Sequence, residues 1–326
     1  MFEGKKILIT GGTGSLGTAL VNRLLKMKPN TIRIFSRDEL KQTELQSEIS
    51  DERLRFLIGD IRDKDRIMRA MEDIDIVFHT AALKHVPVAE YNPFEFVKTN
   101  VYGTQNVIDA CLENDIEVAV AIGTDKAVSP ANTYGATKLL MERLFISANH
   151  YKGNHKVRFL SVRYGNVLGS RGSVLPLFKN QIETGKKITI TDPKMTRFNI
   201  TMDEALDLIF RAVNTGKGGE VFVPKLDAYS VGVLKDAICE LLGKDPVIKK
   251  IPVRIGERTH EILISKDELR YAYETKKDYI IYDSDTISKT KLSHKKANLS
   301  DEYSSDKVKL LNVNELKKII QKSGLI

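Results

Sequence analysis

The sequence predicts an α/β fold built on a doubly wound parallel sheet, followed by a smaller C-terminal lobe. Two observations carry this prediction. Short, fully apolar runs alternate with segments of helical spacing up to about residue 165, and a glycine-rich turn follows the first run. Fully apolar strands are typical of sheets covered by helices on both faces. The chain of 326 residues is long enough for one large domain and a second lobe.

The expected elements follow one another along the chain. Lys5 to Thr10 is apolar and runs into glycines, which indicates a buried strand, and Ser15 to Met27 carries its leucines on one helical face. The same criteria predict strands at 32–36, 54–58, 74–79, 116–122 and 157–163, and helices at 38–49, 63–71, 93–114 and 134–150.

Beyond residue 165 the alternation weakens. Turn signals such as Gly169-Ser170-Arg171-Gly172 become frequent and helices become fewer. We therefore expect a nucleotide-binding domain over residues 1–165 and a substrate-binding lobe over 166–282, whose strands can interleave with the first domain. Residues 283–326 form a polar segment that ends in an amphipathic helix at 308–320.

Charge and composition exclude several classes of protein. The net charge of 51 − 43 = +8 fits either nucleic acid or an anionic small ligand. The basic residues are spread along the chain and tryptophan is absent, which favours the small ligand over nucleic acid. No apolar run is long enough to cross a bilayer and the first strand starts at once, so we expect a cytoplasmic protein without a membrane partner. Cys111 and Cys239 predict buried free thiols, and the histidines lack metal-ligand spacing, so no metal is expected.

The turn between the first strand and the first helix reads Thr10-Gly11-Gly12-Thr13-Gly14-Ser15-Leu16-Gly17. Glycines permit a tight turn and a close approach of the backbone to a pyrophosphate, and the helix N-terminus offers free N–H groups. An ordinary glycine turn is the alternative. The position between strand and helix favours a dinucleotide site formed by Gly11, Thr13, Gly14, Ser15, Leu16 and Gly17.

The end of the second strand bears on which dinucleotide binds. An acidic residue there would suit the ribose hydroxyl of NAD, but this strand ends in Ser36-Arg37, with Lys41 one turn later. A hydroxyl and two cations suit a 2′-phosphate, which predicts NADP. Alternatively, Arg37 only pairs with Asp38 or Glu39. After the third strand, Asp60 and Ile61 are placed to flank the adenine, unless Asp60 only caps a helix.

Tyr134 and Lys138 lie four residues apart, which puts them on one helical face. A cation beside a phenol lowers its pKa, so Tyr134 can take a proton from a sugar hydroxyl while a nicotinamide takes the hydride. Thr124, after the fifth strand, can hydrogen-bond the same hydroxyl. The same spacing also arises by chance on solvated helix faces.

Asp125 and Lys126 form the distinctive pair of this sequence. Oxidation of a sugar at C4 makes its C5 proton acidic. Lys126 can then remove that proton if neighbouring cations such as Lys138 lower its pKa, and Asp125 can protonate the departing C6 hydroxyl. The alternative is a simple turn in which Asp125 caps the next helix and Lys126 faces solvent.

Further motifs complete a resemblance to a known family. They are Phe35 to Lys41, Ala81 to Pro87, Thr124 to Ala127, Tyr134 to Lys138, Arg163 to Val167, Gly169 to Val174 and Met195 to Phe198. On these segments the chain resembles the extended short-chain dehydrogenase/reductase superfamily, whose fold is the Rossmann type. Within it, residues from about 5 to 282 are similar to the inverting UDP-N-acetylglucosamine 4,6-dehydratases of the pseudaminic-acid type.

The resemblance implies roles for individual residues. Asp125 and Lys126 would be the elimination acid and base, and Tyr134, Lys138 and Thr124 would serve the redox step. Ala81 and Lys84 would join the NADP site. The UDP-sugar would be held by Lys84, Asn166, Arg171, Gly172, Ser173, Val174, Arg197, Arg254 and Glu257. The implied enzyme is an inverting hydro-lyase that makes a UDP-4-keto-6-deoxy-hexosamine for surface glycans, in a superfamily where homo-oligomers are usual.

Two other functions stay open on the sequence alone. A UDP-sugar C4-epimerase of the same superfamily would need Tyr134 and Lys138 but neither Asp125 nor Lys126. A non-catalytic NADP-binding sensor or scaffold would tolerate the loss of Tyr134, and the intact tyrosine–lysine pair argues against it.

Overall fold

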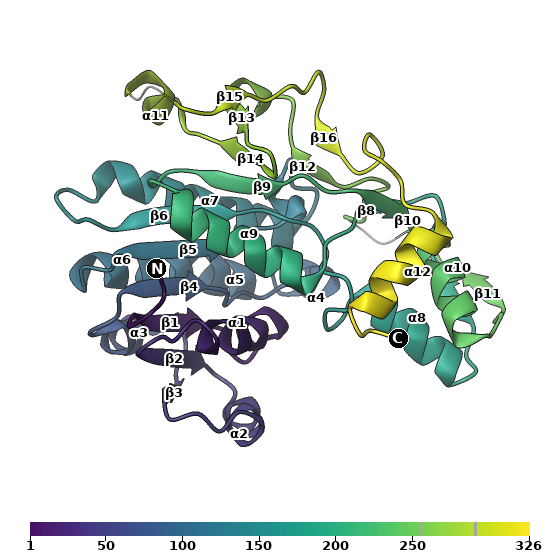
Figure 1. Ribbon diagram of the computed structural model, residues 1–326, viewed down its shortest axis with the longest axis horizontal. Helices are drawn as coiled ribbons and strands as arrows, with labels where there is room; N and C mark the ends of the chain where they lie inside the picture. Colours follow the sequence, from purple (N-terminus) through teal and green to yellow (C-terminus); the bar gives the residue numbers. More distant parts are fainter. Residues whose placement is uncertain (254–255, 290–291) are drawn as a thin grey trace.

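The computed structural model describes residues 1–253, 256–289 and 292–326, which form a central sheet between helices and a smaller lobe beside it (Figure 1). The strands of the sheet are β1 (Lys6–Thr10), β2 (Thr31–Ser36), β3 (Leu54–Ile58), β4 (Ile76–His79), β5 (Val118–Ile122), β6 (Arg158–Val162), β9 (Val221–Pro224), β13 (Ala272–Glu274), β14 (Asp278–Ile281) and β15 (Lys295–Lys296). Their order is β15-β13-β14-β9-β6-β5-β4-β1-β2-β3. From β9 to β3 neighbouring strands run parallel, and β14, β13 and β15 add an antiparallel edge.

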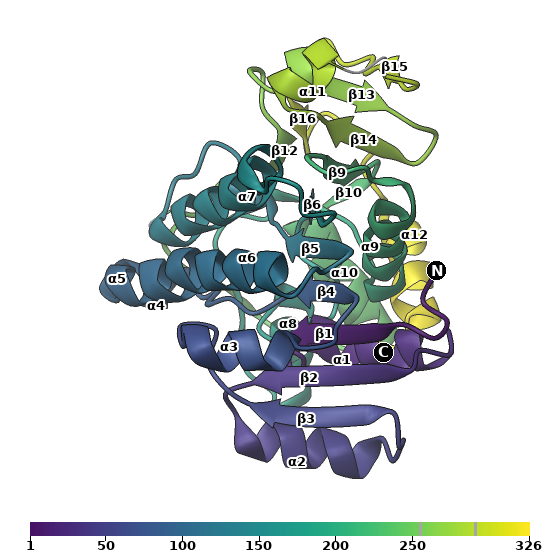
Figure 2. The same ribbon diagram turned by 90° about the vertical axis from the view of Figure 1, so that its left-hand side faces the viewer.

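Helices cover both faces of this sheet (Figure 2). One face packs against α3 (Lys64–Met71), α6 (Gly103–Glu113) and α7 (Thr133–Tyr151), whose buried side chains form one core cluster with those of the strands. The other face packs against α1 (Ser15–Leu25) and α9 (Met202–Thr215) through a second cluster. The helix α2 (Glu39–Glu48) lies beside the outer strand β3. This arrangement confirms the predicted doubly wound α/β fold.

The smaller lobe has its own apolar cluster. Its helices are α8 (Val174–Glu183), α10 (Val231–Leu242) and α12 (Val313–Lys322). Its strand pairs are β7 (Ile188–Ile190) with β11 (Ile248–Lys250), β8 (Thr196–Phe198) with β10 (Ala228–Ser230), and, nearer the sheet edge, β12 (Ile262–Ile264) with β16 (Tyr303–Ser304). The strands β9, β13 and β14 come from residues beyond 165 yet extend the main sheet. The division of the chain at residues 165 and 282 stays a prediction.

Several short elements complete the fold. They are α4 (Val86–Tyr91), α5 (Pro93–Phe96), a π-helical turn η1 (Val97–Tyr102), the 3₁₀ turns η2 (Asp125–Ala127) and η3 (Leu269–Tyr271), and α11 (Ser284–Lys289). The helix predicted at 93–114 is therefore α5, η1 and α6 in succession, whereas α4 was not predicted. The final helix begins at Val313 rather than at residue 308, because Asn312 and Glu315 form a capping box there.

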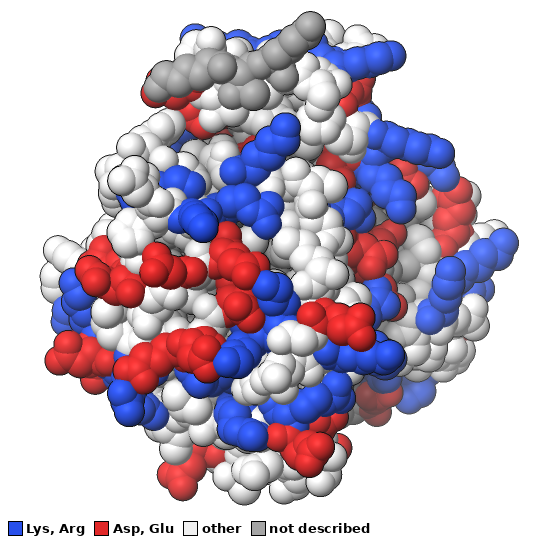
Figure 3. All heavy atoms as spheres, turned by 60° about the vertical axis from the view of Figure 1, so that its left-hand side comes forward, with Lys and Arg blue, Asp and Glu red and all other residues white. Residues whose placement is uncertain are grey.

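Charge on the surface is mixed. Figure 3 shows basic and acidic side chains interspersed over one face of the molecule rather than gathered into a single patch. Within the described ranges, no helix combines the length and the apolar character that crossing a bilayer requires. Cys111 and Cys239 are both buried free thiols, which confirms that prediction.

One buried charge ties the sheet to the chain beyond it. Arg163 follows β6 and is only 1% exposed. Its Nε donates to Glu142 of α7 at 3.1 Å, and its Nη1 and Nη2 donate to Glu268 at 3.0 and 2.9 Å. The two carboxylates compensate the guanidinium, so the three groups can be buried only together.

Replacement of Arg163 by methionine tests this network. The variant keeps a long apolar side chain but leaves the buried Glu142 and the largely buried Glu268 without their cation, so we expect the free energy of unfolding to fall by ~3–5 kcal/mol. Urea unfolding followed by circular dichroism measures this. Arg270→Met, at an exposed arginine, should change stability by less than ~0.5 kcal/mol. Equal stability of wild type and Arg163→Met would show that the network contributes nothing.

Candidate active site

Two adjoining cavities lie at the edge of the sheet where the parallel strands β1, β4, β5 and β6 end. The strand order reverses between β1 and β4, which is where open α/β sheets bind ligands. The larger, of about 1000 Å³, is lined by the glycine turn and is called the loop cavity. The smaller, of about 350 Å³, is lined partly by α8 and the segment 189–197 and is called the lobe cavity. Both cavities are lined by Lys84, His85, Asn166, Ser170 and Arg171.

The glycine turn brings backbone to the wall of the loop cavity. Gly11 has a φ of +67°, and a Cβ there would lie 2.8 Å from the Cα of Ala81. A Cβ on Gly17 would lie 2.5 Å from the Cα of Gly12. The turn can therefore pack against α1 only if residue 17 has no side chain. The structure places every predicted cofactor residue in this lining: Gly11, Thr13, Gly14, Ser15, Leu16, Gly17, Ser36, Arg37, Lys41, Asp60, Ile61, Ala81, Lys84, Tyr134 and Lys138.

The cations after β2 are held by acids in the structure. Arg37 lies 3.6 Å from Asp60, a partner that differs from the neighbouring Asp38 and Glu39 considered from sequence. Lys41 donates to Asp38 at 2.6 Å. Half of the Arg37 side chain is exposed, so its guanidinium remains accessible at the mouth of the loop cavity.

Tyr134 and Lys138 lie on the first turns of α7, and both are buried. Asn132 starts this helix by accepting the Gly135 N–H at 2.8 Å. The Lys138 ammonium donates to the Ile122 carbonyl at 2.6 Å, and burial lowers its pKa to about 7. Burial raises the pKa of Tyr134, against smaller lowering effects of Lys126 and of a hydrogen bond from Thr124. The expectation that Lys138 lowers the pKa of the phenol was therefore wrong, because the amine bonds to the main chain and burial disfavours its charged form.

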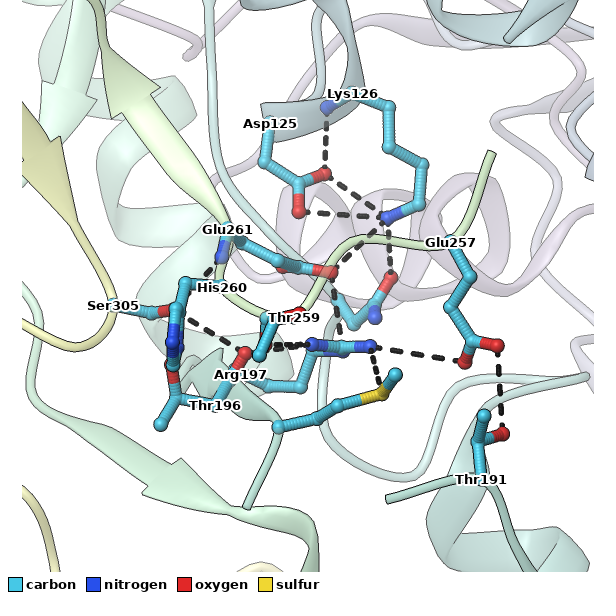
Figure 4. A network of polar contacts seen from close by, with 12 residues as sticks. Asp125, Lys126, Thr191, Thr196, Arg197, Glu257, Thr259, His260, Glu261 and Ser305 are labelled. Carbon is cyan, nitrogen blue, oxygen red and sulfur yellow. Dashed lines mark hydrogen bonds and ion pairs between the residues drawn. The ribbon is translucent and has the colours of Figure 1, made fainter. Parts of the chain in front are cut away.

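Asp125 and Lys126 occupy the turn η2 after β5 and line the lobe cavity (Figure 4). The Thr124 hydroxyl donates to Asp125 Oδ1 at 2.7 Å. Lys126 Nζ lies 3.2 Å from the same oxygen, 3.3 Å from Asn166 Oδ1 and 3.4 Å from Glu261 Oε1. The amine is thus paired with three oxygen atoms, and only about a quarter of the Lys126 side chain is exposed.

These contacts decide the charges of the pair. Burial lowers the pKa of Lys126, but Asp125 and Glu261 outweigh it and the pKa is raised overall. Burial raises the pKa of Asp125, but Lys126, Glu261 and Thr124 outweigh it and hold that pKa well below its usual value. The expectation that neighbouring cations lower the pKa of Lys126 was wrong, because its nearest charged neighbours are carboxyl groups. At rest the proton is on Lys126 and not on Asp125.

Glu261 is a site residue that the sequence did not reveal. It is 6% exposed, and its Oε1 lies 3.3 Å from Arg197 Nε. Burial, reinforced by Asp125, raises the pKa of its carboxyl to about 8. The one available signal was its position directly before the apolar run Ile262-Leu263-Ile264. A charged residue that directly precedes a buried strand is itself expected to be at least partly buried.

The predicted substrate residues surround the lobe cavity. Arg197 is buried, donates to the Thr196 carbonyl at 2.7 Å and lies 3.9 Å from Glu257. Arg171 reaches the loop cavity, where it donates to the Thr13 carbonyl at 3.2 Å. The lining includes Lys84, Asn166, Arg171, Gly172, Ser173, Val174, Arg197 and Glu257, whereas Arg254 lies outside the described residues.

Arg258 also lines this cavity and was missed from the sequence. Its Nη2 donates to the Ser129 carbonyl, and its Nη1 is buried without a hydrogen-bond partner in the described parts of the chain. The family pattern pointed to Arg254, four residues earlier in the sequence, instead of Arg258.

Comparison with known proteins identifies the family. The model of the family described as polysaccharide biosynthesis protein matches residues 7–283. The chain belongs to this family. It is 50% identical over 283 residues, covering 86% of this chain and 84% of the relative, to a Campylobacter jejuni protein named UDP-N-acetylglucosamine 4,6-dehydratase (inverting). The solved structure of Pen from Bacillus thuringiensis has 42% identity and a TM-score of 0.94, with 100% and 99% of the two chains covered. These matches confirm the resemblance drawn from the motifs.

The comparisons also correct one prediction. A Rickettsia akari protein named UDP-glucose 4-epimerase is 40% identical over 98% of this chain and 96% of its own. Epimerases are isomerases, so assigning the single class of inverting hydro-lyase from the sequence was too narrow. The relatives support an enzyme of the short-chain dehydrogenase/reductase superfamily, with both dehydratases and epimerases among its homologues. A dTDP-glucose 4,6-dehydratase from Streptomyces venezuelae, solved with NAD, shares the fold at 23% identity and a TM-score of 0.71 over 78% and 86% of the chains.

The buried Lys138 gives a testable dependence of stability on pH. Its pKa falls to about 7 in the folded chain, whereas the unfolded chain keeps the ordinary value of 10.5. Between these values the unfolded chain binds more protons, so stability from this group is complete above the higher value and lost as the pH falls towards 7. The stability of wild type relative to Lys138→Met should therefore rise with pH in this window, by at most ~1.4 kcal/mol per pH unit. Urea titrations at several pH values measure the difference, and a flat difference would contradict the assignment.

Proposed function

We propose that this chain removes water from UDP-N-acetylglucosamine to give a UDP-4-keto-6-deoxy-hexosamine. The observation that carries the proposal is the buried Asp125 with the partly buried Lys126 3.2 Å away, both in the lining of the lobe cavity. Epimerisation at C4 needs an acceptor for one hydroxyl proton. Elimination across C5 and C6 also needs a base and an acid, and this pair supplies both. The name of the Campylobacter relative, an inverting dehydratase, supports the same reaction with inversion at C5.

The loop cavity suits a nicotinamide dinucleotide. The turn from Gly11 to Gly17 admits a pyrophosphate against bare backbone, and the α1 N-terminus behind it carries partial positive charge. When bound, the cofactor would supply the oxidation at C4 and the later reduction at C6. Arg37, half exposed at the cavity mouth, favours NADP over NAD, because its guanidinium can exchange Asp60 for a 2′-phosphate.

The lobe cavity suits the UDP-sugar. Arg171 and Arg197 offer planar guanidinium donors for a diphosphate, and Arg197 is held in place by its bonds to main-chain carbonyls. The Oδ1 of Asn166 lies 3.3 Å from Lys126 Nζ, and Asn166 lines the same cavity as the two arginines. The acid–base pair therefore borders the cavity in which the arginines would bind the diphosphate. The sugar would then lie where the two cavities adjoin.

In this arrangement Tyr134, assisted by Thr124, takes the O4 proton at the side of the loop cavity. Tyr134 must first ionise to do so, and the positive charge of an oxidised nicotinamide in this cavity would favour its ionisation. Lys126 takes the C5 proton and Asp125 protonates the C6 oxygen. These roles require one prior proton transfer from Lys126 to Asp125 across the 3.2 Å contact. A bound sugar that excludes water favours this transfer, because a neutral pair is easier to bury than two ions.

Incubation with UDP-N-acetylglucosamine in heavy water tests the reaction. Wild type should release a product lighter by one water that carries deuterium at C5, with the configuration at C5 inverted. Lys126→Ala should lose water elimination by ~100-fold or more while C4 oxidation persists. The exposed Lys64→Ala serves as control and should match wild type. Mass spectrometry and NMR read both results, and a wild-type product with all its oxygen atoms would refute the proposal.

An epimerase is the second candidate, favoured by the relatives of that name and by the intact Tyr134, Lys138 and Thr124. The same incubation separates the two functions. An epimerase would give UDP-N-acetylgalactosamine and would not depend on Lys126 in this way.

Cofactor choice is tested at Arg37. Its replacement by alanine removes a charge-assisted bond to the 2′-phosphate, so NADP affinity should fall ~10-fold or more while NAD affinity changes little. Isothermal titration calorimetry measures both. Arg69→Ala, at an exposed arginine of α3, is the matched control. Equal losses for the two dinucleotides would argue against NADP selection by Arg37.

A further inference from the structure

Five charged residues in the lining of the lobe cavity lie close together (Figure 4). The acids Asp125 and Glu261 lie 3.2 and 3.4 Å from Lys126, and Glu261 and Glu257 lie 3.3 and 3.9 Å from Arg197. Glu257 is about a quarter exposed, whereas Asp125 and Glu261 are both buried beside the same amine. Ionising two neighbouring buried carboxyl groups is costly because they repel, and a proton on one of them removes this repulsion.

The contacts indicate that Glu261 carries this proton. Its Oε1 faces both cations, whereas its Oε2 is buried without a hydrogen-bond partner in the described ranges. A Cβ at Gly165 would lie 3.3 Å from Glu261 Oε2 and 3.7 Å from Asp125 Oδ2, so the two oxygens border the same small space. Two carboxyl groups in such a position repel unless one is protonated. The raised pKa of Glu261, caused by burial and by Asp125, agrees with this assignment.

We propose that Glu261 is uncharged at neutral pH, donates its proton as a hydrogen bond to Asp125, and by staying uncharged lets Lys126 act as a base. Glu261 is then a positioning residue, since it acts through its two neighbours. The kinetic part of this inference rests on the proposed function.

The protons balance in this scheme. Lys126 passes its proton to Asp125 and then takes the proton of C5. The electrons of the broken C5–H bond form the C5–C6 double bond as the C6–O bond breaks, and Asp125 protonates the departing oxygen to give water. Lys126 ends as an ammonium and Asp125 as a carboxylate, as at the start, and Glu261 keeps its proton throughout.

An ionised Glu261 would stop this cycle. A carboxylate 3.4 Å from Lys126 would add attraction for the ammonium and hold the proton on the amine. The charged or titratable groups that face Glu261 are Asp125 and Lys126 from η2, Arg197 from β8 and Tyr229 from β10. Burial raises the pKa of Tyr229, which therefore stays a neutral phenol. Elimination should thus fade as the pH rises through about 8, where Glu261 loses its proton.

Glu261→Gln tests the role, because the amide is uncharged like the acid and nearly the same size. Rates of water loss and of C4 oxidation are measured from about pH 6 to about pH 10, together with thermal melting. Wild type should lose elimination above about pH 8, whereas Glu261→Gln should keep its neutral-pH rate within ~3-fold and retain it at alkaline pH. Glu274→Gln, at a glutamate paired with Lys225 away from both cavities, should keep the wild-type profile. A normally folded Glu261→Gln that keeps the alkaline fall, or that eliminates ~100-fold more slowly at neutral pH, overturns the proposal.

A second measurement does not depend on activity. Infrared spectra of wild type with ¹³C-carboxyl glutamate should show a protonated carboxyl band at pH 7 that vanishes as the pH passes about 8. Burial also raises the pKa of Glu220, so the same spectra of Glu220→Gln, in which the Glu261 band should persist, assign the band. If no such band remains for Glu261, the proposal fails. If the band is present but wild type releases no water, only the proposed function fails.

Discussion

The site depends on main-chain pairing that continues past the ends of two strands. Beyond β5 and β6, the Gly123 N–H donates to the Val162 carbonyl at 2.6 Å and the Asp125 N–H donates to the Tyr164 carbonyl at 3.1 Å. A Cβ at Gly123 would lie 2.7 Å from the Val162 oxygen, so this close approach requires glycine. The two bonds hold the acid–base turn beside Asn166. Without them, neither the 3.3 Å contact from Lys126 to Asn166 nor the junction of the two cavities would be fixed.

A second set of contacts, from far along the chain, closes the site from the other side. The main chain of Glu261 donates to the Ser305 hydroxyl at 2.9 Å and accepts from the Ser305 N–H at 2.8 Å. The same hydroxyl lies 2.6 Å from that of Thr196, which in turn lies 2.8 Å from a His260 ring nitrogen. Figure 4 shows these side chains to one side of Arg197, with Glu257 on the other. Thr196 and Ser305, from two distant segments, thus fix the main chain at Glu261, from which the buried carboxyl group extends towards Lys126 and Arg197.

The sequence was informative where structure is local and silent where it is not. The glycine turn, the spacing of Tyr134 and Lys138 and the apolar strands each depend on neighbours within one turn or one strand, so their patterns predicted the fold and the family. Glu261 meets Lys126 across 135 residues, and no local pattern records that contact. For the same reason the direction of the Lys126 pKa was predicted wrongly. Lys138 is close to Lys126 in the sequence, but in the structure the carboxyl groups of Asp125 and Glu261 are its nearest charged neighbours.

The distribution of groups between the cavities bears on how one fold serves two reactions. The groups suited to oxidation, Tyr134 and Lys138, line the loop cavity, whereas Asp125, Lys126 and Glu261 line the lobe cavity. An epimerase and a dehydratase can share the first set, since both begin by oxidising C4. They differ in whether side chains of the lobe cavity can remove the proton from C5 and protonate the oxygen at C6. On this view the charges buried beside Lys126 decide the reaction. If the amine cannot release its proton, it cannot remove the C5 proton, and the oxidised sugar is only reduced again at C4.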